Sequence, residues 1–293
     1  NQSAKIIFVA GNFHVRTMGV ISASTDPSST GGFGPYMPGY VIVPYNDKKA
    51  MADALEDPNV AGVLVEPIQG EAGVVVPDVD YLPFIQAQCR ERNILFIADE
   101  VQTGIARTGK LLATCGNCSC EGFCENKPEI KPDILILGKA LSGGVLPVSA
   151  VLANDEIMLC IKPGEHGSTF GGNPLACAVA MAALDVVRDE RLDANAEKLG
   201  KIFRERMQQI VEKYPIALLV RGKGLLNAIV VDDDEDGHLA WDICLSLAAK
   251  GLLAKPTHGN IIRFAPPLVM TEDQLHECCD IIEEVISGFN QLS

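Results

Sequence analysis

Residues 133–144 read DILILGKALSGG, an apolar run that leads to a lysine between glycines. A run of this kind, bounded by a charge and a glycine, predicts a buried β-strand with Lys139 just past its end. The glycines keep bulk away from the Lys139 amine, and a lysine shielded from solvent is readily deprotonated to act as a nucleophile. This stretch alone is equally compatible with an ordinary lysine in a strand-to-loop turn and with a nucleophilic one.

A second apolar strand lies upstream, in ILFIADEVQTG (residues 94–104), and it ends at a carboxylate, Asp99. Ligands of open α/β sheets bind beyond the carboxyl ends of the strands, so we expect Asp99 and Lys139 to face one crevice. A lysine that forms a Schiff base and an aspartate beside a pyridinium nitrogen are the two groups that pyridoxal 5'-phosphate requires. The pair therefore points to that cofactor.

The order of the predicted elements indicates the fold class. Strands and helices alternate in the first part of the chain, which implies right-handed βαβ units and a mostly parallel, doubly wound α/β sheet. Strands are expected at 5–10, 41–44, 62–67, 94–99, 133–137 and 148–152, and helices at 48–56, 79–92 and 175–188.

The regular alternation of strands and helices ends near residue 190. Helices are expected at 192–213, 239–250 and 272–287, and short strands at 218–221, 225–231 and 261–264. We therefore predict a large domain over residues 1–189 and a smaller C-terminal α+β domain over residues 190–293. The chain opens almost directly into a strand, so we also expect the N-terminal part of the large domain to be missing from it.

The composition is that of a soluble globular protein, with 47% hydrophobic and 21% charged residues among 293. No apolar run reaches the roughly 18 residues that a membrane span requires. The net charge of −14 argues against binding to nucleic acid or to anionic membranes. Ten cysteines without a secretory leader favour a reducing compartment, either the cytoplasm or the mitochondrial matrix.

Four of the cysteines gather in one short segment: Cys115, Cys118, Cys120 and Cys124. Thiolates at short spacing can hold zinc, but this spacing without a second pair fits a zinc site poorly, and we assign no metal. The other interpretation is a surface insertion with free or redox-active thiols. A non-catalytic protein that binds a metal or a redox partner through this segment is therefore one open alternative.

Several stretches together resemble the class III, ω-amino-acid aminotransferases, which are pyridoxal-phosphate enzymes of fold type I. The resemblance covers nearly the whole chain. The segments GPYMPG (34–39) and LSGG (141–144) are similar to the corresponding segments of the ornithine-using members. The stretches that carry it are VEPIQGEAG (65–73), the Asp99 and Lys139 segments, residues 164–175, LAKPTHG (253–259) and RFAPP (263–267).

This resemblance implies a role for each matched residue at the cofactor. Lys139 would form the Schiff base and move the proton at the substrate carbon, and Asp99 would pair with the pyridine nitrogen. Val101 and Phe13 would pack on the two faces of the ring. Gln102 would hydrogen-bond the ring hydroxyl.

The resemblance also implies a homodimer and a pair of substrates. Ser168 and Thr169 would bind the phosphate of the neighbouring subunit's cofactor. Arg16 would hold the α-carboxylate of L-ornithine, and Arg263 would clamp 2-oxoglutarate once Glu71 releases it. The implied activity transfers the δ-amino group of L-ornithine to 2-oxoglutarate, giving glutamate 5-semialdehyde and glutamate. N-acetylornithine and 4-aminobutyrate remain open as alternative amino donors.

Overall fold

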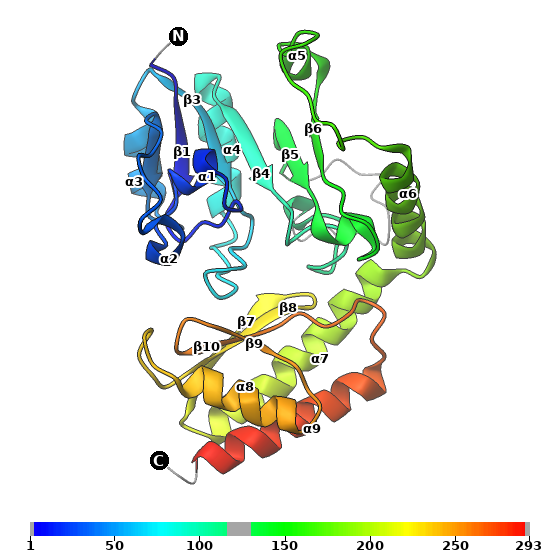
Figure 1. Ribbon diagram of the computed structural model, residues 1–293. Coiled ribbons are helices and arrows are strands. Elements are labelled where there is room, and N and C mark those ends of the chain that lie inside the picture. Colours follow the sequence, from blue (N-terminus) through cyan, green and yellow to red (C-terminus); the bar gives the residue numbers. More distant parts are fainter. Residues whose placement is uncertain (1–2, 116–129, 291–293) are drawn as a thin grey trace.

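The structure is a computed structural model that describes residues 3–115 and 130–290, and a six-stranded sheet organises the first half of it (Figure 1). The strand order is β2-β1-β3-β4-β5-β6; neighbours are parallel from β2 to β5, and β6 runs antiparallel to β5. The expected mostly parallel α/β sheet is therefore confirmed. Its strands are β1 (Lys5–Val9), β2 (Tyr40–Val43), β3 (Val60–Val65), β4 (Leu95–Asp99), β5 (Ile134–Leu137) and β6 (Ala150–Ala153).

The helices that accompany this sheet begin and end where their sequence signals lie. α3 begins after Asp47, whose side chain accepts the N–H of Ala50, and α4 ends at Asn93 in the left-handed conformation. Both helices contribute buried side chains, such as Met51 and Ile85, to the core that the sheet shares with them. The helices of this part are α1 (Met18–Ile21), α2 (Pro27–Thr30), α3 (Lys48–Leu55), α4 (Tyr81–Arg92) and α5 (Asp155–Met158), with the 3₁₀ helices η1 (Ala113–Cys115) and η2 (Lys139–Ser142).

A second, antiparallel sheet of four strands lies below the first in Figure 1, in the order β7-β8-β10-β9. The apolar stripe of α7 packs against this sheet together with α8 and α9, and it forms the largest core cluster. The elements of this part are α7 (Leu192–Lys213), β7 (Ala217–Lys223), β8 (Leu226–Val231), α8 (Leu239–Ala249), β9 (Lys255–Thr257), β10 (Ile261–Phe264) and α9 (Glu272–Asn290), and α6 (Pro174–Asp189), which packs on the first part, precedes them.

The chain passes from one sheet to the other between α6 and α7. Arg191 lies in this turn with a left-handed φ of 51°. The domain boundary expected at residues 189 and 190 falls in the same turn, and the division itself stays a prediction. No helix within residues 3–115 and 130–290 is long and apolar enough to cross a membrane.

The two sheets are joined by contacts that bring the second sheet against the loops of the first. Arg107 donates to the carbonyl oxygens of Leu225 (3.0 Å) and Pro266 (2.6 Å). Arg221 donates to the carbonyl oxygen of Gly73 (2.9 Å). An apolar cluster from the loop after β3 and from β8 and β10 fills the space beside them. Strands β9 and β10 are thereby held beside the loop that follows β3.

Candidate active site

The carboxyl ends of β1, β3, β4 and β5 lie next to one another along one edge of the six-stranded sheet. His14 follows β1, Glu66 follows β3, Asp99 ends β4 and Lys139 follows β5. Asp99 pairs with Ile136 across the parallel strands β4 and β5, and Lys139 lies three residues after Ile136, just past the end of β5. The two residues singled out from the sequence therefore occupy adjacent strand ends, where ligands of open α/β sheets bind.

Asp99 is held by a partner that sequence reasoning missed. Its Oδ2 lies 2.6 Å from Nδ1 of His14, and both side chains are buried, with 9% and 3% of their surfaces exposed. Its Oδ1 accepts the backbone N–H of Val101 at 3.0 Å. The Nε2 of His14 is buried and finds no hydrogen-bond partner among the described residues. Asp99 is thus oriented from two sides, and the only signal in the sequence was a histidine just past a strand.

Glu66 is a second buried carboxyl group that sequence reasoning left without a role. Its oxygens accept the backbone N–H groups of Phe13 (2.9 Å) and Gly70 (3.3 Å). Burial raises the pKa of Glu66 to about 7, although the neighbouring His14 and the hydrogen bond from Phe13 oppose the shift. A carboxyl group that titrates near neutral pH therefore lies beneath the Phe13–His14 segment.

Lys139 differs in one respect from the sequence expectation. The glycines around it suggested a shielded side chain, but the structure leaves Lys139 exposed. Partial burial nevertheless lowers the pKa of the Lys139 amine, against the raising effect of Glu71. Its backbone takes a left-handed φ of 43°, a conformation that a residue without glycine's freedom adopts at a cost and that is frequent at functional sites.

These groups fit pyridoxal 5'-phosphate. A buried, oriented carboxylate is available for a pyridinium nitrogen, and an amine with a lowered pKa is available for the aldehyde. Val101 lies against the Lys139 segment, since a Cβ added at Gly138 would come within 3.3 Å of its Cγ1. The residues that could hold the cofactor therefore converge on one edge of the sheet.

Phe13 and Arg16 lie on the segment that follows β1. Phe13 is half-buried, and the guanidinium carbon of the exposed Arg16 lies 5.9 Å from the centre of its ring. Val15 between them has a φ of 75°, which is strained for a β-branched residue. The hydrogen bonds of His14 to Asp99 and of Phe13 to Glu66 hold this strained segment at the site.

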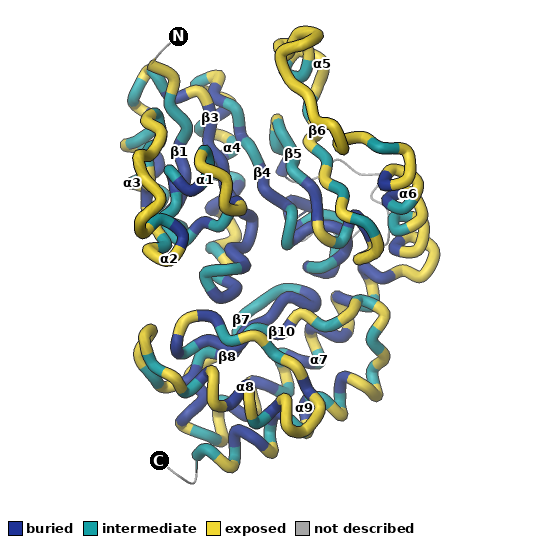
Figure 2. Tube along the Cα trace, in the orientation of Figure 1, coloured by how far each residue is buried: buried dark blue, intermediate teal, exposed yellow. Residues whose placement is uncertain are grey.

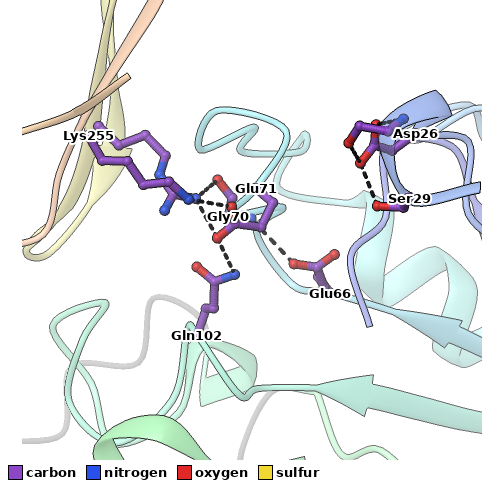
Figure 3. A network of polar contacts seen from close by, with 9 residues as sticks. Asp26, Ser29, Glu66, Gly70, Glu71, Gln102 and Lys255 are labelled. Carbon is purple, nitrogen blue, oxygen red and sulfur yellow. Dashed lines mark hydrogen bonds and ion pairs between the residues drawn. The ribbon is translucent and has the colours of Figure 1, made fainter. Parts of the chain in front are cut away.

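Glu71, in the loop after β3, lies at the centre of a polar network (Figure 3). Its Oε1 accepts from Nη1 of Arg263 (2.9 Å) and from Nε2 of Gln102 (3.1 Å), and its Oε2 accepts from Nζ of Lys255 (2.8 Å). Burial raises the pKa of Glu71, but the hydrogen bond from Lys255 and the charge of Arg263 outweigh it and lower the value to about 2. Glu71 is therefore a carboxylate across the physiological pH range.

Ser168 and Thr169 lie in the exposed loop between α5 and α6. The hydroxyl of Ser168 accepts the backbone N–H of Gly171 at 2.9 Å. No hydrogen bond or ion pair in the part of the chain that the structure describes joins this loop to Asp99 or Lys139. Their assignment to a neighbouring subunit's cofactor stays a prediction.

Most of the cysteine segment falls in a part of the chain of which the structure says nothing. Cys118, Cys120 and Cys124 lie outside the described residues, and Cys115 is buried at the end of η1. Within residues 3–115 and 130–290, no group of three or more histidine, cysteine or acidic side chains is arranged to hold a metal ion.

The chain is similar to curated proteins over nearly its whole length. It is 56% identical over 283 residues to "Ornithine aminotransferase, mitochondrial" of Drosophila melanogaster, covering 97% of this chain and 62% of that protein. It is 54% identical over 286 residues to the protein of the same name in Rattus norvegicus, covering 98% and 62%. The chain therefore spans less than two thirds of the length of these relatives.

Solved structures agree with this similarity. The ornithine aminotransferase of Toxoplasma gondii ME49 superimposes with a TM-score of 0.92 at 44% identity, covering 99% of this chain and 66% of that one. The acetylornithine aminotransferase of Elizabethkingia anophelis gives a TM-score of 0.83 at 53% identity, covering 98% and 66%. The family model for class III aminotransferases matches residues 1–286, and the chain accordingly belongs to the class III aminotransferase family.

Proposed function

We propose that the protein is a pyridoxal-phosphate-dependent aminotransferase that moves the δ-amino group of L-ornithine to 2-oxoglutarate, giving glutamate 5-semialdehyde and glutamate. The observation that supports it best is the placement of Lys139 and the His14-bound Asp99 at adjacent strand ends. The names of the relatives from fruit fly and rat support ornithine as the amino donor.

Each residue at the strand ends has a distinct task in this proposal. When bound, pyridoxal 5'-phosphate supplies an electron sink for the reacting carbon of the substrate. Asp99, oriented by His14 and by the N–H of Val101, would keep the proton on the ring nitrogen. Lys139, whose pKa is lowered, would take the proton from the reacting carbon of the substrate and deliver it to the carbon of the cofactor that receives the amino group. Val101 and Phe13 would hold the ring from its two faces, and Gln102 would bind its hydroxyl.

Two arginines are proposed to sort the substrates by charge. Arg16, stacked on Phe13, holds the α-carboxylate of ornithine away from the reacting end. Arg263 is occupied by Glu71 while ornithine is bound, and it turns to the carboxylate of 2-oxoglutarate in the second half of the reaction. A single site can then accept a ligand with a cationic end and a ligand with two anionic ends.

A homodimer is part of the proposal. Large apolar side chains are exposed from the turn after η2 through α6, a region that Figure 2 colours largely as exposed, and monomers rarely leave such a surface bare. They include Val145, Val151, Leu159, Ile161, Phe170, Leu175 and Met181. In a dimer through this face, Ser168 and Thr169 would reach the phosphate of the partner's cofactor. Sedimentation should then give twice the chain mass, and a monomer at micromolar concentration would contradict the dimer.

The compartment is proposed from the relatives' names. The proteins of fruit fly and rat are named as mitochondrial, which favours the mitochondrial matrix over the cytoplasm for this protein. Fractionation of cells that contain the full-length protein would decide between them.

The test of the reaction compares three amino donors on the full-length protein. We expect ornithine to have the highest kcat/KM, with N-acetylornithine and 4-aminobutyrate well below it; the reverse order would select one of those alternatives. Lys139→Ala should abolish turnover while leaving the fold intact, whereas Lys201→Ala, an exposed lysine on α7, should leave turnover unchanged. Stoichiometric zinc without bound pyridoxal phosphate would instead favour the non-catalytic role of residues 115–124.

A further inference from the structure

Lys255 and Arg263 form an unusual cross-strand pair. They are direct partners in the antiparallel register of β9 and β10, so their side chains leave the sheet on the same face. Two cations opposite each other across a sheet repel and destabilise the pairing. The Arg263 side chain is 13% exposed and that of Lys255 is 58% exposed. Solvent therefore screens the charge of Arg263 less than the charge of Lys255. Some compensating charge is therefore needed between them.

Glu71 supplies the compensating negative charge, and each of its two carboxylate oxygens binds one of the two cations. One carboxylate oxygen, Oε1, binds Arg263 at 2.9 Å, and the other, Oε2, binds Lys255 at 2.8 Å. Gln102 donates to Oε1 as well, at 3.1 Å. Figure 3 shows Lys255 reaching Glu71 from the second sheet while Gln102 approaches from the first. The two cations therefore share one anion without competing for the same oxygen.

This division matters when Arg263 changes partner. A carboxylate that loses its only counter-ion in a partly buried site is left uncompensated, which opposes the exchange. Because Lys255 holds Oε2 independently, Glu71 keeps one cation after Arg263 has turned to a ligand. Lys255 also repels Arg263, which favours the state in which Arg263 has found an anion of its own.

We propose that Lys255 is a positioning residue that retains Glu71 when Arg263 leaves it, and so makes Arg263 available to the carboxylate of the keto-acid substrate. The inference rests on the proposed function in that 2-oxoglutarate is the ligand. In this proposal Lys255 acts through Glu71, the carboxylate that it binds, and not by contact with the substrate or the cofactor. Its effect should appear in the half of the reaction that uses the keto acid and be absent from the half that uses ornithine.

The test separates the two halves of the reaction in Lys255→Met. The KM for 2-oxoglutarate and its dissociation constant, measured by calorimetry, should rise about fivefold to tenfold, which corresponds to the loss of one partly screened charge interaction. The rate and KM of the ornithine half-reaction should stay within about twofold of wild type. Lys255→Arg should restore the keto-acid KM, since it keeps the charge. The matched control is Lys250→Met, a lysine at the C-terminal end of α8 that forms an exposed ion pair with Glu284.

A double substitution distinguishes positioning from a general structural effect. In the Glu71→Gln background there is no carboxylate to retain, so adding Lys255→Met should no longer raise the KM for 2-oxoglutarate. A rise of the same size in that background would overturn the inference, and so would equal losses in both half-reactions or an unchanged keto-acid KM in Lys255→Met. If wild-type protein transfers no amino group from ornithine, the proposed function fails. The calorimetric comparison of 2-oxoglutarate binding would still support or overturn the role of Lys255.

Discussion

Glu66 should make the stability of this protein fall as the pH rises through neutrality. Its carboxyl group is buried at the end of β3, and burial raises its pKa from 4.5 to about 7 in the folded state. Between those two values the folded protein holds a proton that the unfolded chain has released. Stability linked to this group is therefore greatest at acidic pH and is lost as the pH rises towards 7, because the charged form is the one that burial disfavours.

The magnitude follows from the two pKa values. Between about pH 5 and about pH 8.5, a shift from 4.5 to about 7 lowers the free energy of unfolding by about 2.5 kcal/mol. Glu66→Gln removes the titration and keeps the shape of the side chain. The amide has one acceptor where the carboxyl group has two, for the N–H groups of Phe13 and Gly70, so the variant should be less stable by about 1 kcal/mol at acidic pH.

The assay is urea unfolding of wild type and Glu66→Gln, without added cofactor and at one protein concentration, across that pH range. Other groups titrate in both proteins, so the quantity of interest is the difference between their unfolding free energies. We expect wild type to be the more stable at acidic pH and the variant to be the more stable at alkaline pH. A difference between wild type and Glu66→Gln that does not change with pH would refute the reasoning.

Three further substitutions test the backbone and the core. Val15→Gly should stabilise the protein by about 1 kcal/mol in thermal unfolding, because the strain of a valine at φ 75° exceeds the entropy that glycine adds to the unfolded chain; a lower melting temperature would contradict this. Gly200→Ala on α7 should cost more than about 2 kcal/mol, since the new Cβ would collide with the carbonyl oxygen of Gly224. Its control, Gly288→Ala on α9, meets nothing within 4 Å and should be neutral or stabilising by up to about 1 kcal/mol. Leu247→Ala, fully buried on α8, should cost about 2–5 kcal/mol in urea unfolding, and a loss well below that would mean that the site collapses around the smaller side chain.

The elements that could be predicted from the sequence are those with a periodic pattern of their own. The stripe of α7, with Leu199, Phe203, Met207 and Ile210 buried, repeats over many residues, and β5, although only four residues long, is an uninterrupted apolar run between Asp133 and Gly138. The elements that were missed are single turns or short strands. α1, α2 and α5 have four residues each and β9 has three, too few for a hydrophobic period to emerge from local propensity.

The residues of the candidate site also fall into those that could be predicted from the sequence and those that could not. Lys139 and Asp99 could be named from the sequence because each stands at the end of its own apolar strand, and parallel strand ends meet at one edge of a sheet. His14 and Lys255 could not, because their roles come from partners 85 and 184 residues away, Asp99 and Glu71.

By itself, the sequence determined the two classes of sheet, the principal helices and the lysine–aspartate pair, since these depend on short-range periodicity and on which residue ends a strand. Only the tertiary structure decided how Asp99 is oriented, how exposed Lys139 is and how Glu71 divides its charge between Arg263 and Lys255. These features depend on distances between side chains of separate elements. Such distances are set by the packing of one sheet against the loops of the other, and no local pattern of residues records that packing.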